Sequence, residues 1–393
     1  MTENDTFAFD PEGNAASALG FSAVGVHAGF RADPERLDMA LVVADEPCAA
    51  AATFTTNVFC AAPVRVSREH LNEGGAGAPA YGCARAVVVN SGIANAATGE
   101  IGLENARKTA ELVGEAVGCP ADEVLVASTG VIGQHLRLEP FAEGVPAALA
   151  AMAKVADDLA GRTSQGATAA RAIMTTDTCP KHGSVSFSGD GIGYPGVIFT
   201  VGGMCKGAGM IMPNMATMIA VITTDAPLAA PEGPAFTPGT PAFDAFQRAL
   251  DQLATTLARK MAADGEGATR LITVTVRGAA TADDADAAAR TVANSPLVKT
   301  AVYGHDANWG RVAAALGRSG ARFNQEDVDI DILGLPVCRA GLVVDFDEEE
   351  ALRRFEEPEV AIEVDLHAGE ESATMWTCDF SHEYVTINGD YRS

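Results

Sequence analysis

The sequence has few positive charges and no long apolar run. It contains 27 lysine and arginine residues against 52 aspartate and glutamate residues, which gives a net charge of −25 and a pI of about 4.5. An acidic surface of this size repels phosphate backbones and anionic lipids, so nucleic acid and membranes are poor partners. A local lysine can still bind the carboxylate of a small substrate. No stretch reaches the roughly 18 apolar residues of a transmembrane helix.

Patterns for metal binding and secretion are also missing. The eight cysteines are scattered, with no CxxC pair and no Cys/His spacing typical of zinc. We interpret them as buried thiols and expect no metal site. The N-terminus, MTENDTFAFDPEGN, is acidic and polar, unlike a signal peptide. We therefore expect a cytoplasmic protein.

What is present favours a folded α/β protein. The 393 residues are 48% hydrophobic and 20% charged, enough for one large domain or two to three ordinary ones. Strand-like ARAVVVNSG (84–92) is followed by helical LENARKTAELVGEAVG (103–118), then by strand-like EVLVAST (123–129) and a long alanine-rich helix over roughly 138–160. This alternation predicts mixed α/β layers.

The second half changes character at a cluster of prolines. Five prolines fall between Pro227 and Pro241, which predicts an exposed linker, and Thr240 then caps a helix whose first residue is Pro241. Five later stretches alternate apolar and polar residues and are predicted strands: RLITVTVRG, DVDIDILG, EVAIEVDLHAG, SATMWTCDF and EYVTINGDY.

The stretch MPNMATMIAVITTDA (212–226) is a buried, strand-like run in which Thr217 follows the small Ala216. A glycine-rich segment containing Lys206 precedes it. An internal threonine can attack the preceding carbonyl and, after hydrolysis, become an N-terminal residue. Its α-amine, with an ordinary pKa of about 7.7–8.0, can then act as a base for its own hydroxyl. An ordinary strand threonine is the alternative reading.

Two further stretches suit acyl transfer. STGVIG (128–133) lies where a strand ends and the chain turns through Gly130, so backbone N–H groups there can form an oxyanion hole. IMTTDTCPKHG (173–183) carries three threonines and an aspartate, which suits the wall of a polar pocket. Each stretch taken alone fits a plain turn as well.

Together these stretches resemble the ArgJ family, the glutamate N-acetyltransferases also called ornithine acetyltransferases. The resemblance runs nearly end to end and is carried by TFTTNVFCAAPV (53–64), VVVNSGIANAATGE (87–100), LVASTGVIG (125–133), AIMTTDTCPK (172–181), KGAGMIMPNMATM (206–218), DGEGATRLITV (264–274), NSPLVKTAVYGHDANWGRV (294–312) and the terminal EYVTINGDYRS.

The resemblance implies a layered mixed α/β fold of the DmpA/ArgJ type and an enzyme of arginine biosynthesis. Self-cleavage between Ala216 and Thr217 would give an alpha chain (1–216) and a beta chain (217–393), paired in a heterotetramer. N2-acetyl-L-ornithine would acetylate Thr217, and L-glutamate would then take the acetyl group in a ping-pong reaction. No cofactor is implied, although acetyl-CoA is a possible acetyl donor.

The resemblance also assigns the site. Thr129 and Gly130 form the oxyanion hole, and the substrate site is implied for Thr217 together with Thr175, Lys206, Glu266, Asn388 and Ser393. The residue types fit, because Lys206 can neutralise an α-carboxylate and Glu266 can hold an amine. The neighbouring Thr176 is an alternative to Thr175. His305, Asp306 and His382 are interpreted as structural.

Two departures leave other functions open. Ile93 replaces an asparagine of the family pattern, and the region of about 226–241 lacks an acidic, polar segment that family members carry. The alternatives are an N-terminal-threonine amidohydrolase or aminopeptidase, in which water replaces glutamate, and a non-catalytic relative. Measuring acetyl transfer against acetate release separates them.

Overall fold

The computed structural model describes residues 7–72, 80–212, 217–228 and 235–390. The chain divides into two compact units, one extending to Leu257 and one beginning at Ala258, and each is described here by itself. Helix α5 (Pro241–Ala263) contains the boundary. Among the described helices, none is both long and apolar enough to cross a membrane.

The first unit contains a four-stranded sheet in the order β2-β3-β4-β5. The β4–β5 pair is parallel and the other pairs are antiparallel. One face is covered by α1, α2 and α3, which bury Leu103 and Phe141 against Leu41 and Val88. The elements are β2 (Phe21–Val26), β3 (Met39–Ala52), α1 (Ala62–His70), β4 (Ala80–Ile93), α2 (Gly99–Val117), a 3-10 turn (Ala121–Glu123), β5 (Val124–Val131), α3 (Glu139–Ala153) and α4 (Leu159–Ala172).

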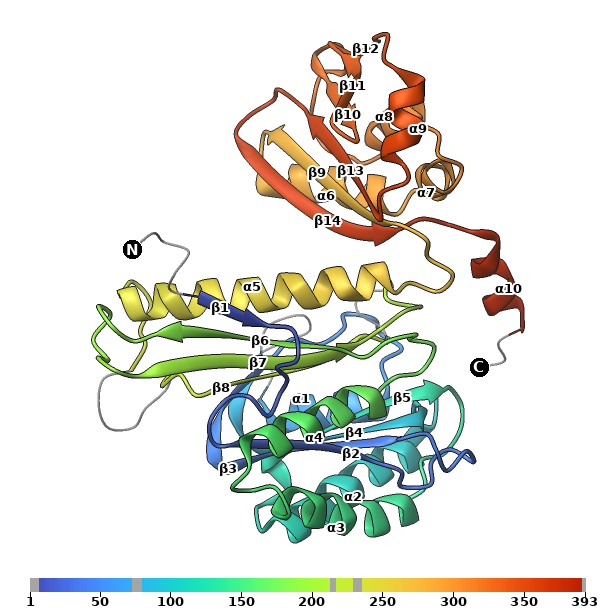
Figure 1. The fold of residues 1–393 in the computed structure, drawn as a ribbon. Coiled ribbons are helices and arrows are strands. Elements are labelled where there is room, and N and C mark those ends of the chain that lie inside the picture. The colour runs from blue at the N-terminus through green and yellow to red at the C-terminus, as the bar shows by residue number, and fades with distance from the viewer. Residues whose placement is uncertain (1–6, 73–79, 213–216, 229–234, 391–393) are drawn as a thin grey trace. The chain divides into compact units, whose positions relative to one another are not determined.

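A second sheet completes the layers of this unit. Its order is β1-β6-β7-β8, with all neighbours antiparallel. Helix α4 lies between the two sheets, where Ala169 and Ile173 join Val42 of β3 and Met204 of β7 in one apolar cluster (Figure 1). The strands are β1 (Phe7–Asp10), β6 (Lys181–Ser188), β7 (Ile198–Lys206) and β8 (Ile219–Thr224).

The second unit is built on a six-stranded sheet, β12-β11-β10-β13-β9-β14, that buries its core against helices. Ile272 and Val274 of β9 pack with Val292 of α6 and Leu316 of α8. The elements are β9 (Leu271–Ala279), α6 (Ala282–Ala293), α7 (Pro296–Tyr303), α8 (Trp309–Gly317), a 3-10 turn (Gln325–Asp327), β10 (Asp329–Ile332), β11 (Leu335–Arg339), β12 (Leu342–Val343), α9 (Glu348–Arg354), β13 (Glu359–Asp365), β14 (Glu371–Cys378) and α10 (His382–Asp390).

The mixed α/β class is confirmed, as are the strands around 84–92 and 123–129 and the helix over 103–118. The cap before α5 is also confirmed, because the N–H of Phe243 donates to Thr240 Oγ1 at 3.3 Å.

Several element predictions are wrong. The predicted helix over 138–160 is two helices, because Asp158 caps α4 by accepting from the N–H of Ala160. The terminal stretch EYVTINGDY is helical rather than extended. β8 is an edge strand with alternating exposure, not a buried one.

The predicted exposed linker is partly core. Phe236 is 1% exposed and its ring lies 5.0 Å from that of Phe199 and 5.1 Å from that of Tyr194. The interpretation of all cysteines as buried is wrong for Cys83 and Cys179, which are exposed.

Candidate active site

The polar centre of the first unit is the ammonium group of Lys206, the last residue of β7. The side chain is 1% exposed, and its Nζ donates to Thr175 Oγ1 at 2.8 Å and to Thr129 Oγ1 at 3.3 Å. Thr129 lies near the end of β5 and Thr175 lies in the turn after α4. Three predicted site residues from distant parts of the sequence are therefore in direct contact.

The carboxylate of Asp177 also contacts the Lys206 ammonium. Its Oδ1 accepts from Lys181 Nζ at 2.7 Å and from the N–H of Gly207 at 2.8 Å. Its Oδ2 accepts from the N–H of Thr175 at 3.0 Å and lies 3.9 Å from Lys206 Nζ. Burial by itself raises the pKa of the Asp177 carboxyl, but the hydrogen bonds from Lys181 and Thr175 and the charge of Lys206 outweigh it and bring that pKa below its ordinary value.

Thr129 and Gly130 occupy a point where two strands approach very closely. The parallel register places Ser91 opposite Thr129 and Gly92 opposite Gly130. Gly130 has φ +128°, and a Cβ there would lie 2.3 Å from the carbonyl carbon of Gly92. Only glycine fits this conformation and this spacing. The predicted turn at Gly130 is therefore a distorted strand residue, since β5 continues to Val131.

Thr217 enters the same region through the hairpin of β7 and β8. Ile219 pairs with Lys206, so Thr217 lies two residues before the start of that ladder. Its φ is +136°, and it is the only β-branched residue with a positive φ in the described part of the chain. That conformation is an outlier for a β-branched side chain and stores backbone strain. Ala216, the predicted residue before the cut, lies outside the described residues.

Two of the remaining predicted substrate residues, Glu266 and Asn388, belong to the second unit. Asn388 on α10 donates to Glu266 Oε2 at 2.8 Å, so these two are paired. The loop that carries Glu266 is fixed by Asp379, whose Oδ1 accepts from the N–H of Thr269 at 2.8 Å. Ser393 lies outside the described residues. Convergence of these side chains on Thr217 stays a prediction.

Asp177 and Lys181 belong to the contacts around Lys206, but sequence reasoning names neither of them as a site residue, because their stretch reads equally as a polar wall or a capped turn. One signal could have found them. Lys181 begins a strand in which it alternates with Gly183 and Val185, and all three are buried. A lysine on the buried face of a strand requires a partner, and the aspartate four residues earlier is the nearest candidate.

The side chains interpreted as structural have structural contacts. The ring of His305 stacks on that of Phe355 with 5.5 Å between centroids, and His382 packs edge-on against Tyr303. Asp306 accepts from Asn308 Nδ2 at 2.9 Å. Within the described ranges, no three His, Cys, Asp or Glu residues are grouped so that they could hold a metal ion.

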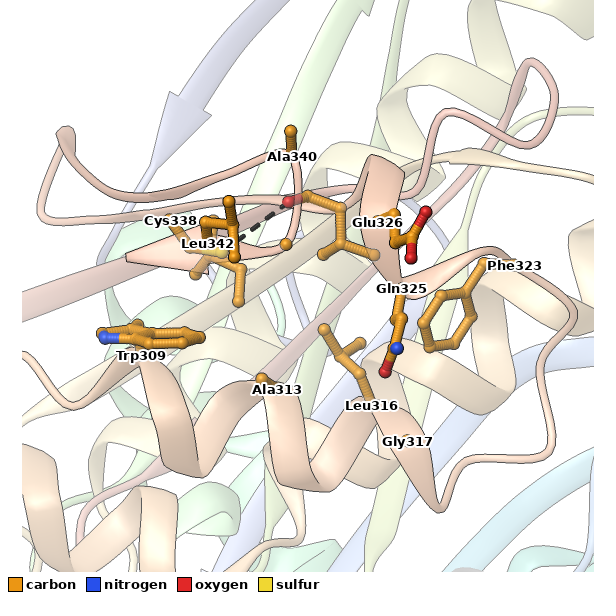
Figure 2. Close-up of a pocket in the computed structure, with 13 residues that line it drawn as sticks. Trp309, Ala313, Leu316, Gly317, Phe323, Gln325, Glu326, Cys338, Ala340 and Leu342 are labelled. Atoms are coloured by element: carbon orange, nitrogen blue, oxygen red, sulfur yellow. Dashed lines mark hydrogen bonds between the residues drawn. The ribbon is translucent and has the colours of Figure 1, made fainter. Parts of the chain in front are cut away.

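A separate pocket of about 640 Å³ lies in the second unit (Figure 2). Its walls are mainly apolar and include Trp309, Leu316 and Phe323, with Glu326 as the charged side chain. The Cys338 thiol faces it and donates to the carbonyl of Val328, and burial raises the pKa of that thiol above its ordinary value. A thiol of raised pKa is a poor nucleophile at neutral pH.

The two departures from the family pattern have different consequences. Ile93 is 5% exposed and packs in the apolar cluster under α2 and α3, so this position is part of the core. In the shortened region after Asp225, the carboxylate of Asp225 accepts from the N–H groups of Thr200 and Leu19, at 2.7 and 2.9 Å. The segment that follows it includes the buried Phe236, so the shortened region is anchored at both ends.

The chain is similar to known proteins along most of its length. The ArgJ family model matches residues 22–237 and 228–393. The chain is 41% identical to the arginine biosynthesis bifunctional protein ArgJ of Chlorobaculum tepidum, over 95% of this chain and 96% of that protein. It is 42% identical to the protein of the same name from Symbiobacterium thermophilum, over 97% of this chain and 99% of that protein. It is 40% identical to the mitochondrial ArgJ of Neurospora crassa, over 95% of this chain and 88% of that protein.

Two solved structures are also similar. A crystal structure of ArgJ from Bacillus halodurans is 42% identical and matches 40% of this chain and 75% of that one, with a TM-score of 0.40. The ornithine acetyltransferase of Mycobacterium tuberculosis, solved with ornithine, is 37% identical. It matches 53% of this chain and 98% of that one, with a TM-score of 0.43.

Proposed function

The chain belongs to the ArgJ family, and we propose that it is a self-processed acetyltransferase of arginine biosynthesis that moves the acetyl group of N2-acetyl-L-ornithine to L-glutamate. The observation that supports this most directly is the contact of Lys206 with both Thr129 and Thr175, at the end of β7 that pairs with Ile219, two residues after Thr217. The family match extends over almost the whole chain, which does not favour the amidohydrolase or the non-catalytic relative.

Processing comes first in this proposal. Thr217 Oγ attacks the carbonyl carbon of Ala216, the C–N bond breaks, and the freed nitrogen takes the hydroxyl proton. Water then hydrolyses the ester, which leaves a carboxylate on Ala216 and restores the Thr217 hydroxyl. The positive φ of Thr217 supports this step, because breaking the peptide bond releases the backbone strain stored there.

Acetyl transfer repeats the same chemistry on a substrate. The free α-amine of Thr217 accepts the hydroxyl proton while Oγ attacks the acetyl carbonyl of N-acetylornithine. The negative charge that develops on the carbonyl oxygen is stabilised by the Thr129 hydroxyl and the N–H of Gly130. The C–N bond breaks, ornithine leaves with the proton, and the acetyl group remains as an ester on Thr217.

Glutamate completes the cycle. Its amine attacks the ester carbonyl, the C–O bond breaks, and the proton released by the amine returns to the threonine hydroxyl. Lys206, Thr175, Glu266, Asn388 and Ser393 are proposed to hold the amino-acid substrates. We also propose that the enzyme requires no cofactor, that acetyl-CoA is a second donor, that the two chains form a heterotetramer, and that the enzyme is cytoplasmic.

A denaturing gel with N-terminal sequencing tests the processing step. We expect two fragments of similar size, with the second beginning Thr-Met-Ile-Ala-Val. The matched control is Thr217→Ala, which should stay uncut. A wild-type band that remains full length after long incubation contradicts self-cleavage.

An acetyl-transfer assay tests the activity. The purified protein is supplied with N-acetylornithine and glutamate, and acetylglutamate and free acetate are both measured. Acetylglutamate should dominate, whereas acetate as the main product would indicate a hydrolase. Replacing N-acetylornithine by acetyl-CoA tests the second donor, and light scattering under native conditions measures the assembly.

A further inference from the structure

Asp177 contacts the Lys206 ammonium but has no role in the steps above. Asp177 is 7% exposed, and its two oxygens contact groups on three segments of the chain. These are Lys181 at the start of β6, Lys206 and the N–H of Gly207 at the end of β7, and the N–H of Thr175 in its own turn. One carboxylate therefore contacts the Lys206 ammonium, the backbone N–H that follows Lys206 and the turn that carries Thr175.

The position of Lys206 decides the direction in which two hydroxyls donate. A lysine ammonium has donors only, so the Thr129 and Thr175 oxygens must accept from it. Each threonine hydroxyl has one hydrogen, and that hydrogen cannot point back toward the ammonium. The hydroxyl of Thr129 is therefore oriented to donate to a group other than Lys206, which is what an oxyanion donor requires.

We propose that Asp177 is a positioning residue for acetyl transfer: it holds the Lys206 ammonium and the turn of Thr175 so that the Thr129 hydroxyl donates to the developing oxyanion. This inference rests on the proposed function. It assigns to Asp177 an effect on the transition state, because an oxyanion donor contributes where charge develops and contributes little to substrate binding. A merely structural aspartate would affect stability and leave the kinetics of the folded enzyme unchanged.

Asp225 provides a matched control. It is also a partly buried carboxylate that accepts two backbone N–H groups, and it lies beside Thr200 at the other end of the β7–β8 hairpin. The first comparison is therefore Asp177→Asn against Asp225→Asn, each purified as folded, processed enzyme. We expect D177N to lower kcat about 100-fold, the effect of losing one oxyanion donor, while KM for N-acetylornithine rises about tenfold at most, the effect of disturbing the Thr175 contact. D225N should stay within about twofold in both.

The pH profile supplies a readout that a structural role would not change. The charged groups facing Asp177 are Lys181 from β6 and Lys206 from β7. Removing the carboxylate makes it easier for the Lys206 ammonium to lose its proton. The alkaline limb of the kcat–pH profile, where Lys206 loses its proton, should therefore move to lower pH in D177N and stay in place in D225N.

A third variant separates positioning from the buried ion pair itself. Lys181→Gln removes one partner of Asp177 and leaves its contacts with Lys206, Thr175 and Gly207. We expect K181Q to keep more than about a fifth of the wild-type kcat, because the positioning contacts are intact. Equal losses in K181Q and D177N would overturn the inference.

The remaining outcomes are also decisive. A wild-type enzyme without acetyl transfer contradicts the proposed function, whereas an active wild type together with D177N of unchanged kcat and unchanged pH limb contradicts only the role of Asp177. If D177N folds but is cleaved too slowly to be purified as processed enzyme, the half-time of cleavage replaces kcat, and a value at least tenfold that of D225N is expected. If D177N does not fold, Asp177→Glu replaces it; wild-type kcat in D177E overturns the inference, and a loss of fivefold or more supports it.

Discussion

Lys206 Nζ donates to the hydroxyl of Thr175 over 2.8 Å, although the two residues belong to different elements and are separated by β6 in the sequence. The contact distinguishes Thr175 from its neighbour Thr176, since both threonines lie in the same half-buried turn. A substrate group bound beside Lys206 would therefore meet the Thr175 hydroxyl.

The first prediction compares these two threonines. Thr175→Val should raise KM for N-acetylornithine about tenfold, because one hydrogen bond to a charged or polar substrate group contributes about 1.5 kcal/mol. Thr176→Val is the control and should stay within twofold. Steady-state kinetics of both variants measure the difference, and equal KM values would remove Thr175 from the substrate site.

The second prediction concerns the oxyanion hole. Thr129→Val removes the hydroxyl that Lys206 contacts and keeps the branched shape, so kcat should fall about 100-fold. Thr129→Ser keeps the hydroxyl and should retain more than a tenth of kcat. Self-cleavage of the two variants on a gel should follow the same order. A fully active T129V enzyme would mean that Thr129 has no part in the chemistry.

The third prediction concerns Gly130. An alanine Cβ there would lie 2.3 Å from the carbonyl carbon of Gly92, so Gly130→Ala must force the two strands apart. We expect a loss of about 3 kcal/mol or more in the free energy of unfolding. Gly133 also has a positive φ, of +83°, but a Cβ at that position would meet no other part of the chain within 4 Å. Gly133→Ala should therefore cost only about 1–2 kcal/mol, as urea titration of both variants would show.

The fourth prediction uses the opposite pKa shifts of two aspartates. The pKa of Asp177 is lowered in the folded protein, mainly by its lysine and backbone donors acting against burial, so its contribution to stability is present above its unfolded pKa of 3.8 and is lost as pH falls through the folded pKa. The stability gap between wild type and D177N, about 3 kcal/mol at pH 7, should therefore narrow below pH 3.8.

Asp225 should behave in the opposite way. Burial raises the pKa of its carboxyl above 3.8, against the hydrogen bonds from Thr200 and Leu19. Wild-type stability relative to D225N should therefore fall as pH rises from 3.8 through that raised pKa. Urea unfolding of the wild type and both variants between pH 3 and 7 measures these trends, and parallel curves would contradict both pKa shifts.

The fifth prediction concerns the shortened region after Asp225. Phe236 is 1% exposed and packs on Phe199 and Tyr194, so Phe236→Ala should lower the free energy of unfolding by about 3–5 kcal/mol. Phe59 is 74% exposed, and Phe59→Ala should change it by about 0.5 kcal/mol or less. Thermal unfolding checks both. A neutral F236A would mean that this segment does not contribute to the core.

The sequence predicts the elements that are determined by local periodicity. Helix α2 ends at Gly118 in a left-handed conformation, as its glycine indicates, and the strands on either side of it are in place. The same reasoning fails for EYVTINGDY, because an alternating pattern forms a strand only where a sheet edge is available. The chain has left β14 at Cys378, and α10 buries no residue of its own that a pattern could reveal.

The contacts of the candidate site can be predicted only in part. The resemblance assigns Thr129, Thr175 and Lys206, but their mutual contact depends on how β5, β7 and the turn after α4 meet in space. Asp177 escapes sequence reasoning for the same reason, since its partners are set by the local turn and the end of β7 together. Backbone strain at Thr217 also has no signature in residue types.

The hairpin of β7 and β8 has a thermodynamic consequence. Its ladder pairs Val201–Lys206 with Ile219–Thr224, and the proposed cut before Thr217 falls between these two strands. Cleavage would leave two polypeptides joined through a shared sheet, so they should copurify without any covalent link. Unfolding would then release two separate molecules, and the midpoint of unfolding would depend on protein concentration. A precursor that folds as one molecule would become an enzyme that reassembles only by a second-order encounter.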